Sequence, residues 1–481
     1  MVHAYAKLVD VHRSAYPSDV QHRPDYAGDA LAESVAVSAR RRLDSVHFLS
    51  EAGPMKYCDS ALEAVGGIQS GEYIWSHSMA ATPVLLLDAL AEHATSCKDV
   101  TLMQLHLEHA DQVTAPALEG HLRHRCFFAG RETRKLINDG RADYVPMFLS
   151  EIPKLFRKGE QRVDTALIQV SPPDRHGNCS LGISVEATKA ACDVAGRIVA
   201  HINPLMPRTH GDSFVNVRDI HSAFQQSEPL INVVSKGSTD TESRIGANVA
   251  SLVDDGACLQ MGIGAIPDAA LRCLGDHKDL GVHTEMFSDG VLPLLESGVI
   301  NNARKKIATG RSVTGFTMGS DALYAHVHDN PEVTFLDIEF VNNPTVIAKN
   351  SRVTSINSAL QIDLSGQVCA DSIGHQIYSG VGGQVDFVLG ATYSEHGKSI
   401  IALPSTAQKG ALSRLVTTLA AGAGVVTTRA QVDYVVTEFG VAELRGRSLG
   451  QRAKDLIAIA HPDFQEALLR EARDTLKLKL S

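Results

Sequence analysis

Three kinds of residue in this sequence could take part in catalysis or ligand binding: a glutamate, several asparagines and several glycines. Glu285 lies in the run His283-Thr284-Glu285-Met286, directly after the apolar residues around Val282. A carboxylate at the end of a buried strand faces the sheet edge where α/β proteins bind ligands. Glutamate has an ordinary pKa of about 4.3, so its carboxylate is already ionised at pH 7. It can therefore act as a nucleophile without a general base to deprotonate it. Capping of a following helix, with Ser288 or Asp289 at its start, is the alternative role for this region.

A glycine-containing loop precedes Glu285 in the chain. The apolar run 257–261 predicts a strand, and it is followed by Gly262, Ile263, Gly264, Ala265 and Ile266. Pro267 then predicts the start of an amphipathic helix. Glycines let a ligand approach the main chain, and a helix start offers unpaired N–H groups to an anion. Because Pro267 replaces the third glycine of a dinucleotide fingerprint, a phosphate loop and a plain turn both remain open.

Two later stretches also combine polar or flexible residues with a neighbouring apolar run. Val341-Asn342-Asn343-Pro344 follows the apolar run 333–340, so its amides either orient a carboxylate or build a turn. Gly380, Gly382 and Gly383 precede the apolar run 385–388, which predicts a strand. Glycines so closely spaced expose several N–H groups, as an oxyanion hole requires, although a flexible turn is the commoner role.

Length and composition limit the class of protein. The chain has 481 residues, of which 44% are hydrophobic and 21% charged, as is typical of a globular protein with two or three domains. The net charge of −10 opposes non-specific binding to nucleic acid or to a membrane surface, since both need a positive field. No apolar run is long enough to span a bilayer. An anionic ligand would therefore be held by local backbone dipoles and a few cations.

The eight cysteines and the N-terminus favour a cytoplasmic protein. The cysteines are scattered without a Cys-x-x-Cys pair, so we expect reduced and mostly buried thiols. The first residues contain no apolar signal core, and their aspartates are untypical of a transit peptide. No metal site is expected, because the 21 histidines show no ligand spacing beyond the weak group His106, Glu108 and His109.

Internal similarities predict a duplicated architecture. The strand 72–75, its loop, Pro83 and the apolar helix 84–90 have the same order as the strand 257–261, its loop, Pro267 and the next helix. Val-Asp followed by apolar residues recurs at 163–168, 385–388 and 432–436, and these runs read as strands buried on both faces of parallel sheets. Chance is the alternative, since Val-Asp is a common dipeptide.

The predicted fold class is α/β, with two related open α/β/α domains, mainly parallel sheets and the active site between them. A polar stretch near 220–240 marks the boundary. We expect an N-terminal extension over 1–60, an N-terminal domain over 61–230 and a C-terminal domain over 231–481 that carries Glu285.

Taken together, these stretches resemble the acetyl-CoA hydrolase/transferase family within the class I coenzyme A transferases, closest to the 4-hydroxybutyrate and butyryl-CoA:acetate types. The motifs that carry the resemblance are VSPPDRHGN (170–178), GIGAIPDA (262–269), HTEMFSDGV (283–291), VNNP (341–344), DSIGHQIYSGVGGQVDF (371–387), DYVVTEFGVAELRGRS (433–448) and AHPDF (460–464). They spread over roughly residues 61–475, and nothing transfers to the first 60 residues.

The resemblance implies roles for individual residues. Glu285 becomes the covalent nucleophile, Asn342 holds it, and Gly382 and Gly383 supply N–H groups to an oxyanion. The residues implied to contact coenzyme A are Gly262, Ile263, Gly264, Ala265, Ile266, Gly380, Gly383, Ser405 and Lys409. Coenzyme A is then a substrate, and no metal or tightly bound cofactor is expected.

The resulting prediction is an enzyme that transfers coenzyme A from a short-chain acyl-CoA to a carboxylate such as acetate, through an acyl-glutamyl anhydride and a glutamyl-CoA thioester. Hydrolysis of an acyl-CoA at the same site is the first alternative, and a coenzyme A-binding module without turnover is the second. A dehydrogenase is disfavoured by Pro267 and by the lack of a clear ribose-binding acid. The resemblance also implies a homodimer or homotetramer.

Overall fold

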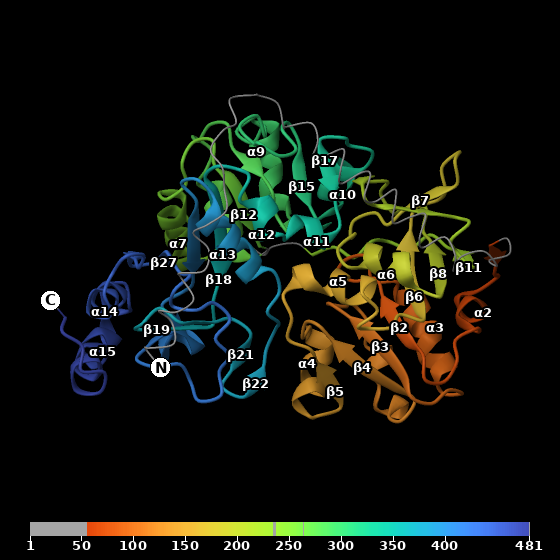
Figure 1. The fold of residues 1–481 in the computed structure, drawn as a ribbon, viewed down its shortest axis with the longest axis horizontal. Coiled ribbons are helices and arrows are strands. Elements are labelled where there is room, and N and C mark those ends of the chain that lie inside the picture. The colour runs from red at the N-terminus through yellow and green to blue at the C-terminus, as the bar shows by residue number, and fades with distance from the viewer. Residues whose placement is uncertain (1–54, 234–236, 263, 481) are drawn as a thin grey trace, which may run out of the picture. The chain divides into compact units, whose positions relative to one another are not determined.

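The computed structural model describes residues 55–233, 237–262 and 264–480 (Figure 1). Most of the predicted N-terminal extension therefore lies outside the described residues, as does Ile263. The described chain begins with a short strand, β1 (Lys56–Tyr57), inside the range predicted as the extension. This strand pairs in parallel with β11 (Ser222–Gln225) at the edge of the first sheet.

The first sheet of the described chain has eight strands. In addition to β1 and β11 these are β2 (Tyr73–Ser76), β3 (Val100–Gln104), β4 (Leu122–Cys126), β5 (Ala142–Tyr144), β6 (Thr165–Val170) and β8 (Arg197–Ile202). Their order is β1-β11-β8-β6-β2-β3-β4-β5, and every neighbouring pair is parallel. Its helices are α2 (Ala61–Val65), α3 (Val84–Ala94), α4 (Arg131–Asn138), α5 (Ile152–Arg157) and α6 (Thr188–Val194).

The second large sheet has six strands in the order β13-β12-β18-β23-β27-β28. They are β12 (Cys258–Met261), β13 (Gly281–Val282), β18 (Val353–Ser358), β23 (Lys398–Ala402), β27 (Tyr434–Thr437) and β28 (Gly440–Glu443). All pairs are parallel except β27 with β28. The accompanying helices are α7 (Asp240–Ala250), α8 (Ala265–Arg272), α9 (Leu292–Glu296), α10 (Asp321–Val327), α11 (Ile338–Val341), α12 (Pro344–Ile347), α13 (Gln384–Tyr393), α14 (Leu449–Ala458) and α15 (Pro462–Asp474).

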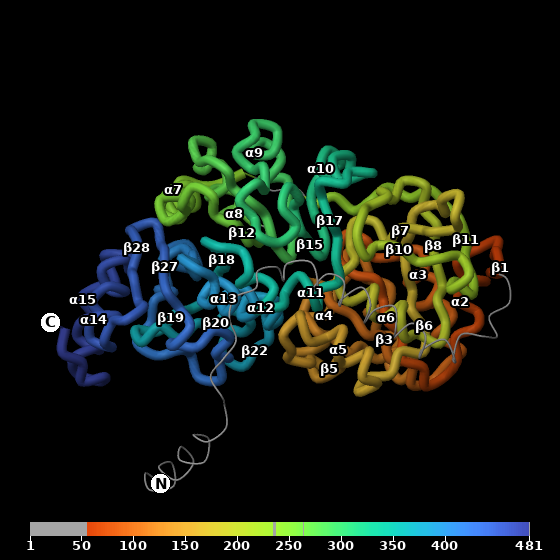
Figure 2. Tube along the Cα trace, turned by 45° about the horizontal axis from the view of Figure 1, so that its top comes forward, coloured from red at the N-terminus to blue at the C-terminus, as the bar shows by residue number. Residues whose placement is uncertain are grey.

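The two sheets have corresponding topology. In the first, the chain passes from β2 to β3 on one side and later to β6 on the other; in the second it passes from β12 to β13 and later to β18. Each sheet therefore has a switch point beside its first long strand, where open α/β sheets place their ligands. The predicted α/β fold of two related halves with mainly parallel sheets is confirmed. Figures 1 and 2 show the first sheet on the right and the second on the left.

One of the predicted strands is wrong. The run 385–388 forms the first turns of α13 and not a strand, whereas 163–168 and 432–436 do overlap β6 and β27. Val385, Phe387, Val388 and Ala391 are all buried, so α13 lies in the interior. A short continuous apolar run is compatible with a buried helix as well as with a strand, and periodicity does not separate the two.

The halves share a continuous apolar core. One cluster of buried side chains contains Trp75 and Phe156 of the first half together with Phe287, Phe335 and Phe387 of the second. Such burial is the main driving force for packing the two sheets together. The loops at the ends of their strands are consequently held at fixed positions relative to one another.

Cysteine burial and membrane segments were also predicted from the sequence. All eight cysteines are free thiols, and six of them are buried, as expected; Cys273 is exposed.

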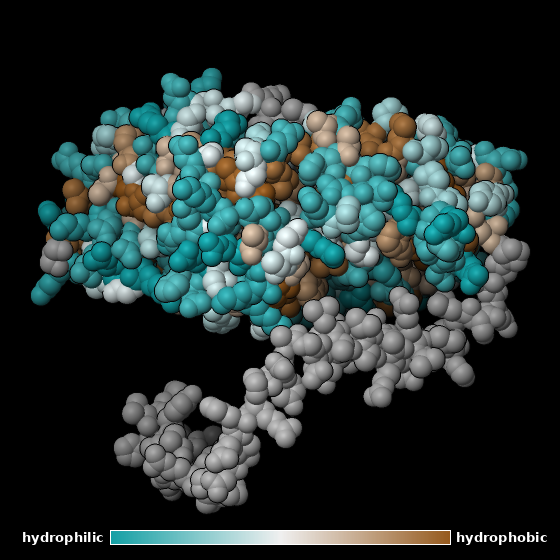
Figure 3. Space-filling view, turned by 90° about the horizontal axis from the view of Figure 1, so that it is seen from above, coloured by the Kyte–Doolittle hydropathy of each residue, from teal (hydrophilic) through white to brown (hydrophobic). Residues whose placement is uncertain are grey.

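None of the helices in the described ranges is long and apolar enough to cross a membrane. In the space-filling view of Figure 3, most of the coloured surface is hydrophilic, and hydrophobic side chains gather in several separate patches.

Candidate active site

The main chain at Glu285 is fixed by hydrogen bonds to its carbonyl oxygen. Glu285 lies between β13 and the short strand β14 (Met286–Phe287), which pairs with β16 (Phe316–Thr317). Its carbonyl accepts hydrogen bonds from Gly315 N at 3.0 Å, Phe316 N at 3.2 Å and Thr314 Oγ1 at 3.1 Å. The side chain therefore leaves a rigid backbone and not a mobile loop tip.

The two residues before Glu285 connect it to neighbouring elements. The buried Thr284 hydroxyl lies 2.9 Å from the carbonyl oxygens of both Met261, at the end of β12, and Met286. The ring of His283 donates from Nε2 to Val341 O at 2.8 Å, because a carbonyl oxygen can only accept. Burial lowers the pKa of His283 to about 3, so the ring is neutral. The glycine loop after β12 and the asparagine after Val341 are thus tied to the Glu285 backbone.

The side chain of Glu285 is held by Asn342. Asn342 Nδ2 donates to Glu285 Oε2 at 2.8 Å, and Asn342 is fully buried. The neighbouring Asn343 instead caps α12 by accepting the backbone N–H of Thr345 at 2.9 Å. Both roles left open for the two amides are therefore present, one at each asparagine.

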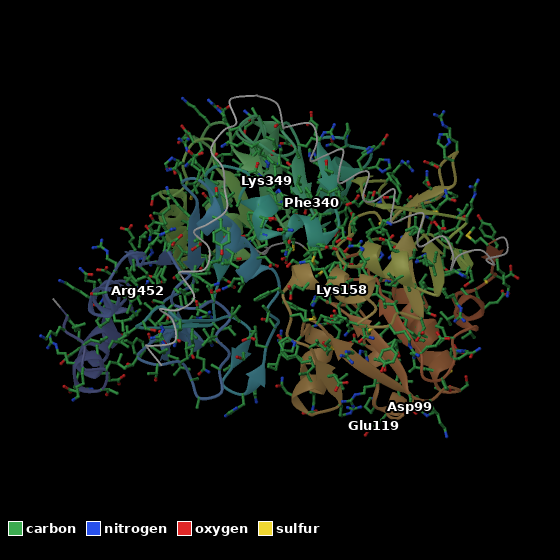
Figure 4. All side chains as sticks on the ribbon, in the orientation of Figure 1. Asp99, Glu119, Lys158, Phe340, Lys349 and Arg452 are labelled. Carbon is green, nitrogen blue, oxygen red and sulfur yellow. The ribbon has the colours of Figure 1, made fainter. Side chains whose placement is uncertain are left out.

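Asn342 is the C-cap of the short helix α11, which the sequence does not reveal. The apolar run 333–340, for which the sequence predicted no particular element, divides into β17 (Val333–Phe335) and α11. Phe340, labelled in Figure 4 together with Lys349 just after α12, marks this helical part of the run.

Gly383, the last of the three glycines at 380, 382 and 383, packs against the same carboxylate. Gly383 is the N-cap of α13, and a Cβ at this position would collide with Glu285 Oε2 and Asn342 Nδ2. A Cβ at Gly380 would lie 2.6 Å from Cδ2 of Phe128, a residue of the first half. Gly382 has a φ of +58°, and its carbonyl accepts the N–H of Leu149 at 3.0 Å. Glycine is thus required at 383 by the close approach of the carboxylate.

Burial changes the acidity of Glu285. It raises the pKa of Glu285 to about 7, against the lowering effect of the hydrogen bonds from Asn342 and the Gly383 N–H. The sequence-based expectation of a carboxylate with an ordinary pKa therefore needs correction. The group is a stronger base than a free glutamate, and it sits at the N-terminus of α13, where a negative charge is favoured.

The residues expected to contact coenzyme A lie at one edge of the second sheet. Gly262 follows β12, and Gly264 is the exposed N-cap of α8 with a φ of +118°, so the helix begins at Ala265 and before Pro267. Ile266 is partly buried against the apolar cluster under α7 and α8. The Gly262 loop and the loop after β23 are separated by β18 alone, that is by about 10 Å.

Ser405 and Lys409 follow β23, and they differ in whether a ligand can reach them. Ser405 is fully buried, and its hydroxyl donates to Glu438 Oε1 at 2.6 Å, while its N–H donates to Glu438 Oε2. Lys409 is exposed on a 3-10 turn with a φ of +58°. Lys409 is thus free to meet an anion, whereas Ser405 positions its loop.

Three residues near the site were missed from the sequence. Phe128 packs against Gly380, and Ser150 donates from Oγ to the buried carboxylate of Asp386 at 2.9 Å. Phe128 and Ser150 belong to the first half, so their proximity to Glu285 depends on long-range packing that no local pattern encodes. Asp386 stood within a recurring Val-Asp pattern but was interpreted as part of a strand.

The fold and this site define an α/β enzyme built from two similar halves, with a glutamate at the switch point of the second. The family model described as acetyl-CoA hydrolase/transferase N-terminal domain matches residues 53–235, and the one for the C-terminal domain matches residues 319–472. The chain belongs to the acetyl-CoA hydrolase/transferase family. The predicted family and the predicted coenzyme A-transferase class are thus confirmed.

Individual relatives agree with this assignment. The chain is 47% identical to a 4-hydroxybutyrate coenzyme A transferase of Clostridium kluyveri, over 86% of this chain and 96% of the relative. It is 46% identical to a succinyl-CoA:acetate/propanoyl-CoA:succinate CoA transferase of Fasciola hepatica, over 88% and 89%. The crystal structure of 4-hydroxybutyrate CoA-transferase from Porphyromonas gingivalis is 40% identical and superposes with a TM-score of 0.75, over 87% of this chain and 97% of that one.

Proposed function

We propose that the protein transfers coenzyme A from a short-chain acyl-CoA to a carboxylate acceptor such as acetate, with Glu285 as the covalent nucleophile. The observation that carries this proposal is the carboxylate of Glu285 held by Asn342 at the N-terminus of α13, against Gly383. The glycine leaves room beside the carboxylate oxygen, and its N–H at the helix start favours negative charge there.

In the proposed reaction, a carboxylate oxygen of Glu285 attacks the thioester carbonyl carbon. The carbon–sulfur bond breaks, which gives an acyl-glutamyl anhydride and the coenzyme A thiolate. The thiolate then attacks the glutamyl carbonyl, releasing the donor acid and forming a glutamyl-CoA thioester. The acceptor carboxylate attacks this thioester, and the thiolate finally takes the new acyl group and frees Glu285.

Each attack passes through a tetrahedral oxyanion, which needs hydrogen-bond donors. Asn342 Nδ2 and the N–H groups at Gly382 and Gly383 are the donors we assign to it, and one donor is typically worth about 3 kcal/mol. The loops 262–266 and 404–410 are assigned to coenzyme A, whose remote binding energy orients the reacting carbonyl.

Transfer and hydrolysis differ in the fate of the anhydride and of the thioester. If the site excludes water, only a carboxylate reaches the glutamyl carbonyl and the product is a new acyl-CoA; if water enters, the product is free coenzyme A. We favour transfer, since Asn342 is fully buried and Phe128 of the first half packs against Gly380, in the same turn as Gly383.

The test is a steady-state assay with isotopically labelled acetate and a panel of short acyl-CoAs, comprising acetyl, propionyl, butyryl, succinyl and 4-hydroxybutyryl donors. Label appearing in acetyl-CoA supports transfer and ranks the donors. Thiol release that is independent of acetate would assign hydrolysis. Tight coenzyme A binding without either product would leave a non-catalytic binding module.

The domain boundaries at 60 and 230, a homodimeric or homotetrameric assembly and a cytoplasmic location remain predictions.

A further inference from the structure

Asn342, which binds the carboxylate of Glu285, sits at the C-terminal end of a very short helix. The helix α11 has four residues, so its two ends lie only about 6 Å apart. A helix of this length is not stable by itself and takes its position from the contacts at its ends. At the C-terminal end, Val341 O accepts the ring N–H of His283. Whatever fixes the N-terminal end of α11 therefore also influences where Asn342 lies.

The N-terminal end of α11 is bonded to residues of the first half. Asp337 is the N-cap, and its Oδ1 accepts the N–H of Glu339 at 2.8 Å. The N–H of Asp337 donates to Asp212 Oδ2 at 3.2 Å. The N–H of Ile338 donates to the carbonyl oxygen of Glu186 at 3.3 Å. Both acceptors precede residue 230, so the first half of the chain sets where α11 begins.

Arg157, at the end of α5, adds a charged contact to the same helix end. The helices α5 and α11 contact each other (Figure 1). Nη2 of Arg157 donates to Asp337 Oδ2, and its Nη1 donates to Glu339 Oε2 at 2.7 Å. Nη2 also donates to Asp193 Oδ2 on α6 at 3.1 Å. No other ion pair of the described residues reaches Asp337 or Glu339. One guanidinium thus joins two helices of the first half to the start of α11.

Burial makes this contact more demanding than an ion pair on the surface. The side chain of Asp337 is only 9% exposed and that of Arg157 is 31% exposed. A carboxylate removed from water needs a partner, so loss of the guanidinium would leave Asp337 buried without its counter-charge. The start of α11 would then move toward water. A lysine is an incomplete substitute, because a guanidinium presents several N–H groups in a fixed plane and an ammonium is a point charge.

We propose that Arg157 is a positioning residue for Asn342. Its guanidinium fixes the N-terminal end of α11 to the first half, and the short helix carries that position to Asn342 and so to the carboxylate of Glu285. This inference rests on the proposed function, because it adds a positioning residue to the nucleophile assigned there. The first half then orients the nucleophile, although Asn342 and Glu285 both belong to the second.

The first test is the substitution Arg157→Met, which removes the guanidinium and keeps a long side chain. We expect kcat to fall about tenfold while KM for the acyl-CoA changes less than about twofold, because a small displacement of a reacting group is costly. Arg123→Met is the matched control, since Arg123 of the same half pairs with Asp143 through two hydrogen bonds at an exposed place on β4 and β5. The control should keep the parent kcat.

Arg157→Lys extends this test to a variant that keeps the charge, should Arg157→Met not fold. We expect its kcat to fall about threefold or more, since one ammonium cannot reproduce the planar set of donors. A kcat equal to that of the parent in Arg157→Met, or in Arg157→Lys where only that variant folds, would overturn the proposal.

A double substitution separates positioning of Asn342 from a general loss of structure. If Arg157 acts through Asn342, its effect disappears once Asn342 has lost its carboxamide. In the Asn342→Ala background we therefore expect Arg157→Met to lower kcat by less than about twofold further. A further loss of about tenfold would mean that the two effects are independent, and it would overturn the proposal.

Titration of Glu285 supplies a readout that does not need turnover. Infrared difference spectra of each protein against its own Glu285→Gln variant follow the carboxylate band with pH. The hydrogen bond from Asn342 lowers the pKa of Glu285, so its loss in Arg157→Met should raise that pKa by about half a pH unit or more. An unchanged pKa would overturn the role of Arg157. A parent enzyme that moves no coenzyme A would instead refute the proposed function, and the titration would still test Arg157.

Discussion

Asn342 Nδ2 and Glu285 Oε2 are 2.8 Å apart, although 57 positions separate the two residues in the chain. Glu285 follows a strand of the second sheet and Asn342 ends a short helix, so the pair forms only when the topology brings their elements together. In the proposed reaction, this hydrogen bond orients the carboxylate and provides a donor to charge that develops on it. Its loss should affect catalysis more than folding.

Asn342→Ala should lower kcat roughly tenfold to a hundredfold, because one donor to the oxyanion and to Glu285 is removed. The matched control is Asn343→Ala in the same motif, which deletes the cap of α12 and should cost about 1 kcal/mol of stability without a similar loss of kcat. Steady-state kinetics and thermal melting of both variants check this. Equal kinetic losses in the two would contradict the role given to Asn342.

Gly383→Ala should abolish coenzyme A transfer, since its Cβ would displace both Glu285 Oε2 and Asn342 Nδ2. Gly275→Ala is the comparison, because nothing lies within 4 Å of a Cβ at that position. The second variant should retain full activity. Normal turnover by Gly383→Ala would show that the carboxylate does not sit against this glycine in the working enzyme.

The dependence of kcat/KM on pH should have an acid limb near pH 7. Burial raises the pKa of Glu285 to about 7, and only its ionised form attacks, so activity rises with pH up to that value and then levels. At pH 6 the rate should be about tenfold below the plateau, as expected for a group with one pKa. A limb near 4.5, the ordinary value, would mean that the group is well solvated when it reacts.

Glu285→Gln should be inactive but more stable at alkaline pH. A carboxyl group whose pKa is raised by folding does not lower the free energy of unfolding when the pH is below its unfolded pKa of 4.5. It lowers the free energy of unfolding by the full amount once the pH exceeds its folded pKa of about 7. The variant should therefore gain roughly 1 to 3 kcal/mol at pH 8, and the gain should vanish toward pH 4.5. Denaturant unfolding at both pH values measures it, and a variant less stable at pH 8 would argue against a buried charge.

Much of the fold follows from local pattern, whereas the site depends on contacts across it. The buried strands β6, β12 and β27 and the helix α3 are recognisable from apolar runs and punctuating prolines or glycines. The apolar run at the start of α13 was wrongly assigned to a strand, because a short buried helix and a buried strand can have the same composition.

At the site, the motifs point to Glu285 and Asn342 but not to the environment that sets their chemistry. The pKa of Glu285 depends on burial under α13, and Asp386 acquires its partner Ser150 from the other half of the chain. Such effects arise only after the two sheets have packed, and they have no counterpart in residue spacing.

The most direct test of the central claim is chemical trapping of Glu285. The protein is incubated with an acyl-CoA, reduced with borohydride, digested and analysed by mass spectrometry, with Glu285→Gln as the control. We expect the peptide containing Glu285 to carry the alcohol left by reduction of a glutamyl thioester, and only when acyl-CoA is present. An unmodified Glu285 in a preparation that turns over acyl-CoA would contradict the account.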